Sequence, residues 1–158
     1  MAGVTLLLSS APRAAETLFA GVPVYSIQKT EDTAVSFGAT TPTHAFTATA
    51  VPCPASVGAA GCTLRVSVVS QFRDLAADNA AAIKVIITGP GTAVTPSAII
   101  QVAFASHPLW YSAHSFQWMK RNIPAGTTPT VTVQLGMTAG TGNAGVRTLS
   151  IDVFNGVL

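Results

Sequence analysis

Apolar and polar residues alternate along most of the chain, and this pattern predicts β-strands. Over 62–72, apolar side chains from Leu64 to Phe72 alternate with polar ones. The same period of two recurs over 130–137 and 147–154. Because successive side chains of a strand point to opposite faces, each of these segments is expected to bury one face and expose the other.

Other segments have the alternating or β-branched composition of strands. They span 17–27, 34–38, 44–51, 82–88, 98–105 and 115–123. Good helix formers gather only in 73–82, where one or two helical turns are expected. Short strands separated by Gly-, Pro- and Thr-rich turns predict an all-β fold, a jelly-roll-like β-sandwich of about eight or nine strands.

The N-terminal segment 1–17 shows neither a strand period nor a helix period. We therefore expect an extended N-terminal arm over 1–17 that packs on a partner, followed by a single β-sandwich domain over 18–158. Leu6, Leu7, Leu8 and Arg13 are its candidate contact residues. The apolar run Val4–Leu8 is shorter than the hydrophobic region of a signal peptide, and no positively charged residue precedes it. No signal peptide is therefore predicted. No stretch reaches the ~18 apolar residues of a spanning helix, so no membrane partner is expected.

The charge content is low for a chain of 158 residues: 9% of the residues are charged, and the net charge is +2. An average domain has roughly a quarter charged residues. A Ser-, Thr-, Ala- and Gly-rich surface gives little charge repulsion against self-association, so a homo-oligomer is predicted. The basic residues are scattered and only Lys120 and Arg121 are adjacent, which argues against a nucleic-acid partner.

The sequence GTGNAG, from Gly140 to Gly145, has the G-x-G-x-x-G spacing of a dinucleotide-binding loop. Such a loop needs a helix after it, with the helix N-terminus facing the pyrophosphate. A strand-like segment follows Gly145 instead. The motif is therefore predicted to be a glycine-rich hairpin loop, and no cofactor is expected.

No group of residues in the sequence has the composition and spacing of a catalytic site. His44, His107 and His114 have no third ligand nearby that would complete a metal site. No serine lies in a G-x-S-x-G nucleophile elbow, and no two carboxylates are placed for glycoside hydrolysis. The chain is predicted not to be an enzyme and to hold no metal.

Aromatic residues make up only 7% of the chain, yet several gather in HPLWYSAHSFQW, residues 107–118. Phe116 and Trp118 share one face of a predicted strand and are expected in the core. Trp110 and Tyr111 precede that strand in a predicted loop, where aromatic side chains often anchor an interface. They are the candidate partner-contact residues.

Cys53 and Cys62 enclose a segment rich in Pro, Gly and Ala. Such a segment can close on itself as a disulfide-bonded loop. In a reducing cytoplasm the same residues would be two free thiols. The sequence leaves both states open.

The C-terminal part, from Ser115 to Phe154, resembles the final strands of jelly-roll modules in virion proteins of tailed bacteriophages. The matching residues are Ile123, Pro124, Ala125, Gly126, Thr127, Val131, Val133, Gln134, Arg147, Thr148, Leu149 and Ile151. The family includes head decoration (cement) proteins and tail-fibre tips, which are commonly homotrimers. The family has no catalytic residues whose roles the resemblance could assign to this chain.

This resemblance implies a virion structural protein, with a homotrimer as the expected form of the homo-oligomer. It points most directly to a decoration protein that binds the major capsid protein on the capsid exterior and stabilises the particle. The chain would assemble in the host cytoplasm and reside in the virion. A tail-fibre tip that binds a glycan and a single-jelly-roll coat subunit remain open as alternatives.

Overall fold

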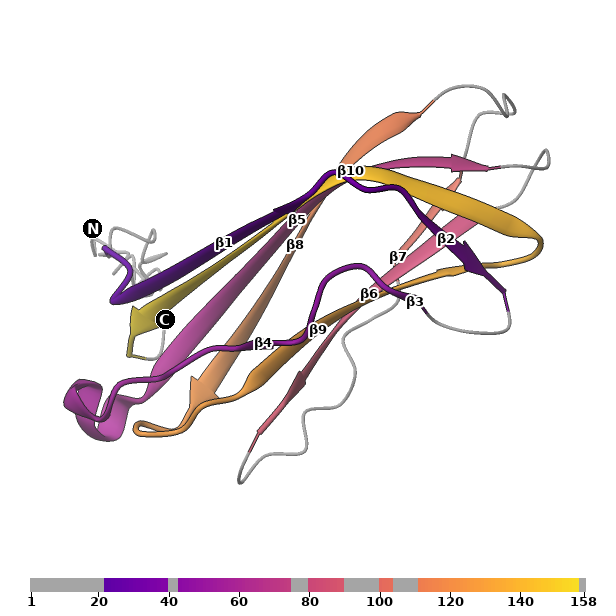
Figure 1. Ribbon diagram of the computed structural model, residues 1–158. Coiled ribbons are helices and arrows are strands. Elements are labelled where there is room, and N and C mark those ends of the chain that lie inside the picture. Colours follow the sequence, from indigo (N-terminus) through magenta and orange to yellow (C-terminus); the bar gives the residue numbers. More distant parts are fainter. Residues whose placement is uncertain (1–21, 40–42, 75–79, 90–99, 104–110, 157–158) are drawn as a thin grey trace, which may run out of the picture.

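The computed structural model describes residues 22–39, 43–74, 80–89, 100–103 and 111–156, and these form two stacked antiparallel sheets (Figure 1). Sheet A contains β1 (Tyr25–Glu31), β2 (Val35–Gly38), β10 (Thr141–Asn155), β5 (Cys62–Asp74) and β8 (Ser112–Ile123). Sheet B contains β3 (Thr43–His44), β4 (Thr49–Ala50), β9 (Thr130–Met137), β6 (Ala80–Thr88) and β7 (Ile100–Ala103). A 3-10 helix, η1 (Ala55–Ala60), lies between β4 and β5.

The strand pairing is that of a jelly roll. β1 and β2 pair in turn with β10, and β3 and β4 pair in turn with β9. β5 pairs with β8, and β6 with β7. If β1–β2 and β3–β4 are counted as two interrupted strands, eight strands remain, and the first pairs with the last, the second with the seventh and so on inward. The predicted jelly-roll-like β-sandwich is confirmed.

The core is formed by the apolar faces that the sequence period identified. Every second residue of β5, β9 and β10 is buried between the sheets. These buried residues include Leu64, Val66, Val68, Phe72, Val131, Val133, Leu135, Met137, Leu149, Ile151 and Val153. Phe116 and Trp118 on the edge strand β8 are half-buried and pack against this core. β6 alternates in burial as well, and it includes the predicted strand 82–88.

Three expected elements differ from the structure. β1 continues to Glu31, beyond the predicted 17–27. The predicted strand 44–51 is two short pieces separated by a segment in which Ala45 and Phe46 are buried in the core, although the Ala45 amide still donates to Val133 O of β9 at 2.9 Å. The helix expected over 73–82 is wrong at both ends of this range. Its first residues belong to β5 and its last to β6, and both pair with neighbouring strands. Residues 75–79 lie outside the described part of the chain.

The GTGNAG segment is mostly strand, so the prediction of a hairpin loop is wrong. Only Gly140, with φ 66°, lies in the turn, and the five residues after it belong to β10. Gly142 pairs with both β2 and β5. A Cβ at Gly142 would lie 2.7 Å from the sulfur of Met137 and 3.1 Å from Cζ of Phe37. Core packing, rather than loop flexibility, requires this glycine.

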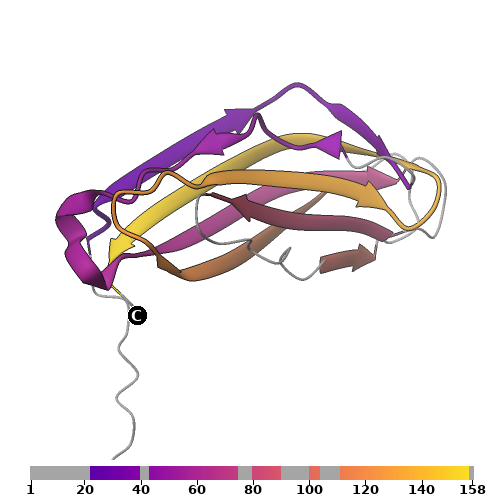
Figure 2. The ribbon, with the colours of Figure 1, turned by 90° about the horizontal axis from the view of Figure 1, so that it is seen from below.

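The sandwich has two distinct ends, because the strands of both sheets run lengthwise between them (Figure 2). The disulfide end holds η1, the start of β1 and the end of β10 (Figure 1). The arginine end holds the β9–β10 turn, the end of β5 and the start of β8. β10 alone has 15 residues, so the two ends are separated by about 50 Å.

Candidate interaction site

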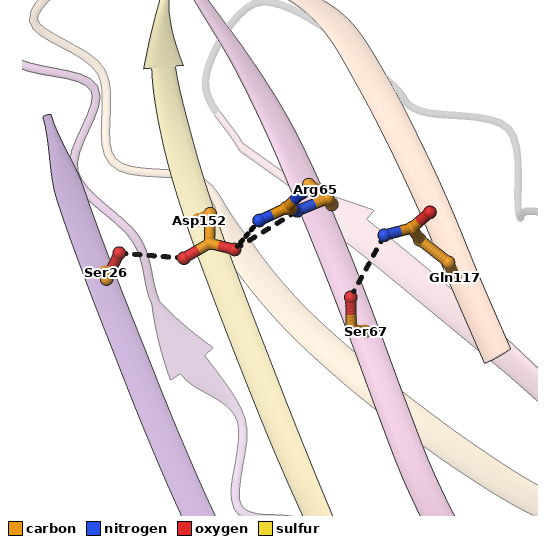
Figure 3. Close-up of polar contacts among 5 residues, drawn as sticks. All are labelled: Ser26, Arg65, Ser67, Gln117 and Asp152. Atoms are coloured by element: carbon orange, nitrogen blue, oxygen red, sulfur yellow. Dashed lines mark hydrogen bonds and ion pairs between the residues drawn. The ribbon is translucent and has the colours of Figure 1, made fainter. Parts of the chain in front are cut away.

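The outer face of sheet A carries a ladder of hydrogen-bonded polar side chains (Figure 3). Ser26 Oγ donates to Asp152 Oδ1 at 2.8 Å, and Arg65 Nη2 lies 2.7 Å from Asp152 Oδ2. Gln117 Nε2 donates to Ser67 Oγ at 3.4 Å on the next rung. Burial raises the pKa of Asp152, but the hydrogen bonds from Arg65 and Ser26 and the charge of Arg65 outweigh it, so the net pKa is lowered.

The charges of Arg65 and Asp152 offset each other in the middle of this outer face, which also has several exposed apolar side chains. Its ion pair between Arg65 and Asp152 is the one ion pair among the described residues. Val69, Val146 and Met119 on the same face are 47%, 46% and 42% exposed. A surface with paired charges and exposed aliphatic side chains is the kind that a partner subunit covers at low electrostatic cost.

A cluster around Arg73, which we call the arginine cluster, lies where this face meets the arginine end. It comprises Ser36, Arg73, Tyr111 and Asn143, contributed by β2, β5, the residue before β8, and β10. The Arg73 guanidinium lies 4.9 Å from the centre of the Tyr111 ring. With the Asn143 amide oxygen toward Arg73, Nη2 donates to it at 3.0 Å, and the amide nitrogen donates to Ser36 Oγ at 2.8 Å.

Gly145 makes room for the Tyr111 ring. A Cβ at Gly145 would lie 3.1 Å from Cε1 of Tyr111 and 3.1 Å from the Gln71 side-chain oxygen. The ring therefore reaches from the start of β8 over β5 to β10, and 38% of Tyr111 remains exposed. Tyr111 lies just before β8 and outside any strand, as predicted for a loop residue, and its ring packs closely on the sheet.

Arg147 is buried on the opposite, inner face of β10, with 6% of its surface exposed. Its Nε donates to the Ala45 carbonyl, and its Nη1 donates to the carbonyls of Thr33 at 2.8 Å and Gly145 at 3.1 Å. Burial lowers the pKa of Arg147, and attraction to Glu31 partly opposes this shift. The side chain thus ties the β1–β2 and β3–β4 corners to β10. An arginine at a position where the period of two requires an apolar residue was the sequence signal for this role.

A disulfide between Cys53 and Cys62 closes the loop that contains η1, with the two Cα atoms 5.9 Å apart. Both cysteines are buried. The Cys53 amide donates to Thr127 O at 2.8 Å, and Gly156 donates to Gly61 O at 2.9 Å. The disulfide end is therefore held by a covalent bond and by hydrogen bonds that join the η1 loop to the β8–β9 turn and to the end of β10. Of the two states that the sequence left open, the structure has the disulfide.

His114 is part of an aromatic row on β8. Its ring is stacked with Phe116, with 6.3 Å between the ring centres, and Ser112 Oγ lies 2.9 Å from His114 Nε2. No group of three or more His, Cys, Asp or Glu residues could hold a metal ion among the residues that the structure describes. In the same part of the chain, no helix is long and apolar enough to cross a membrane.

Most of the predicted partner-contact residues lie outside the described part of the chain. These are Leu6, Leu7, Leu8, Arg13 and Trp110. His107 also lies outside it. Tyr111 is described, and the structure joins it to Arg73, Asn143 and Ser36, which the sequence did not suggest as site residues.

No protein-family model and no curated protein sequence matches the chain. Solved structures of virus particles share its fold. The T=1 particles derived from infectious bursal virus align over 94% of this chain and 41% of theirs, with a TM-score of 0.53 and 11% identity. The VP2 subviral particle of infectious bursal disease virus aligns over 86% of this chain and 39% of its own, with a TM-score of 0.51 and 9% identity. This chain spans about two fifths of the length of each.

Proposed function

We propose that this chain is a virion structural protein, and more specifically a decoration protein that binds the capsid exterior as an oligomer and stabilises the particle. The jelly-roll fold, shared with proteins that build virus particles, is the observation that carries the proposal. The middle of the outer face of sheet A, where Arg65 pairs with Asp152 beside Val69 and Met119, supports it, because this part can be buried against a second copy or a capsid subunit at little electrostatic cost. Each contact can be weak, since many copies on one particle multiply the binding.

The N-terminal arm, residues 1–17, is the proposed contact with the major capsid protein. The first described residue, Val22, precedes β1 at the disulfide end, so this end would face the capsid. Deleting residues 1–17 should reduce binding to particles and lower their thermal stability. Changing Leu6, Leu7 and Leu8 to serine should have most of this effect, whereas Ser9→Ala with Ser10→Ala serves as the control. Unchanged particle binding after the deletion would rule out the arm contact.

A coat subunit is a second candidate, favoured by the fact that the proteins of similar fold form particles themselves. Assembly in the absence of this chain separates the two roles. If the chain is a decoration protein, intact particles form without it and are less resistant to heat. If it is a coat subunit, no particles form. Native mass spectrometry of the purified chain tests the trimer, and the copy number per particle distinguishes hundreds of surface copies from the few expected of a tail tip.

A further inference from the structure

We infer that the arginine cluster is a binding site for a carboxylated sugar, such as a uronic or sialic acid. The first ground is the charge of Arg73. In the described part of the chain no carboxylate lies within ion-pair distance of it, whereas Arg65 on the same strand pairs with Asp152. A guanidinium has five N–H donors in a planar fork that matches a carboxylate, and Asn143 takes one of them.

The second ground is that Arg73 is already held in place. The Tyr111 ring supports one face of the guanidinium, and the Asn143 amide fixes one edge. Asn143 is itself bonded to Ser36 and to the Gly142 carbonyl at 3.0 Å. An arginine whose rotamer is fixed before binding loses less entropy when a carboxylate docks on its free edge.

The surroundings favour a sugar over an acidic protein side chain. Ser36, Gln71 and the Tyr111 hydroxyl supply neutral donors and acceptors that can pair with the hydroxyl groups of a pyranose. Val146, 46% exposed, lies beside Gly145 and offers a small apolar contact for the C–H face of the ring.

The position of the cluster also suits a ligand outside the particle, and in this respect the inference rests on the proposed function. The arginine cluster and the start of β1 lie at opposite ends of the sandwich. If the disulfide end faces the capsid, the cluster faces the medium, where a host surface presents acidic sugars.

Titration of the isotope-labelled protein with glucuronic acid and with N-acetylneuraminic acid, followed by NMR, tests the inference. We expect at least one of the acids to shift the Arg73 Nε–H signal and the Asn143 and Gly145 amide signals, with a Kd in the millimolar range that is usual for a single sugar contact. The methyl ester of that acid should bind at least about tenfold more weakly, because the ester cannot accept a bidentate charged pair. If neither acid bound, or if acids and esters bound alike, the inference would be overturned.

Three variants locate the site. Arg73→Gln should weaken binding of the acids at least about tenfold. Asn143→Asp should weaken binding by a similar factor although Arg73 is kept, because the new carboxylate would pair with the guanidinium in place of the sugar. Arg121→Gln removes an exposed arginine elsewhere on the same sheet and should leave binding unchanged. Equal losses in all three variants would indicate nonspecific attraction and would contradict the site.

Particle binding distinguishes the inference from the proposed function. Arg73→Gln should still bind particles if the cluster faces outward. If the variant lost particle binding and the wild type bound no acidic sugar, the carboxylate would belong to a capsid subunit and the sugar site would be wrong. If the wild type bound acidic sugars but no particle, the proposed function would fail and the sugar site would stand.

Discussion

The two ends of the sandwich are stabilised in different ways. At the disulfide end, a covalent bond and backbone hydrogen bonds link η1, the β8–β9 turn and the last residues of β10. At the arginine end, the cluster on the outer face depends on side-chain contacts of Arg73, Tyr111 and Asn143. On the inner face, Arg147 holds the neighbouring strand corners.

This difference indicates a division of roles. Backbone hydrogen bonds and a disulfide tolerate changes in most surrounding side chains, which suits an end that must keep its shape. A cluster built from side chains depends on the identity of each of its residues, so substitutions there can change what the cluster binds without changing the fold. The comparison predicts four substitution effects, from the largest to the smallest.

Arg147→Met should have the largest effect on the free energy of unfolding, a loss of about 3–5 kcal/mol. The substitution leaves the carbonyls of Ala45, Thr33 and Gly145 without their donor in a buried site. Urea unfolding measures the loss. Arg65→Met, which breaks a partly exposed ion pair, is the control and should cost below about 1 kcal/mol. Similar losses in the two variants would mean that Arg147 is not the main support of the strand corners.

Replacing Cys53 and Cys62 together by alanine should cost about 2–3 kcal/mol, because the disulfide closes a short loop. The melting temperature should fall by roughly 5–10 °C. Hydrogen exchange should speed up at the amides of position 53, Gly126 and Gly156, and remain unchanged at Asn143. Faster exchange at both ends would show that the two ends are coupled rather than independent.

Gly145→Ala should cost about 1 kcal/mol, because the new methyl group can be accommodated only by moving the Tyr111 ring or the Gln71 side chain. The ring-current shift of the Arg73 side-chain protons should be lost. The control is Gly38→Ala on β2, where a Cβ meets only the Gly140 carbonyl at 3.7 Å. An unchanged Arg73 signal in the Gly145 variant would contradict the described packing.

Asp152→Asn should have the smallest effect, below about 1 kcal/mol at pH 7. The pKa of Asp152 is lowered in the folded protein, so its contribution to stability is present above the unfolded value of about 3.9 and is lost as the pH falls through the lowered folded pKa. The difference between wild type and variant should therefore shrink between pH 5 and pH 2, as measured by urea unfolding (the pH limits are rough). A difference that is constant with pH would exclude the ion pair as its source.

The period of two was sufficient to predict the sandwich and most of its core. In β5, β9 and β10 the buried residues are those that alternate in the sequence, because local side-chain geometry and solvent exclusion require the same faces. The same local argument failed for GTGNAG. Glycine there suggested backbone freedom, whereas it reflects the nearness of Phe37, Met137 and Tyr111, which are distant in sequence.

By itself, then, the sequence determined an all-β sandwich with low surface charge, since strand periodicity and composition act locally. The tertiary structure alone decided which polar residues meet. Arg73, Tyr111 and Asn143 come together because β10 pairs with β5 and β5 with β8, and this register depends on long-range pairing. The burial of Arg147 was likewise decided by contacts between distant segments, whereas the disulfide joins two residues only nine positions apart in the sequence.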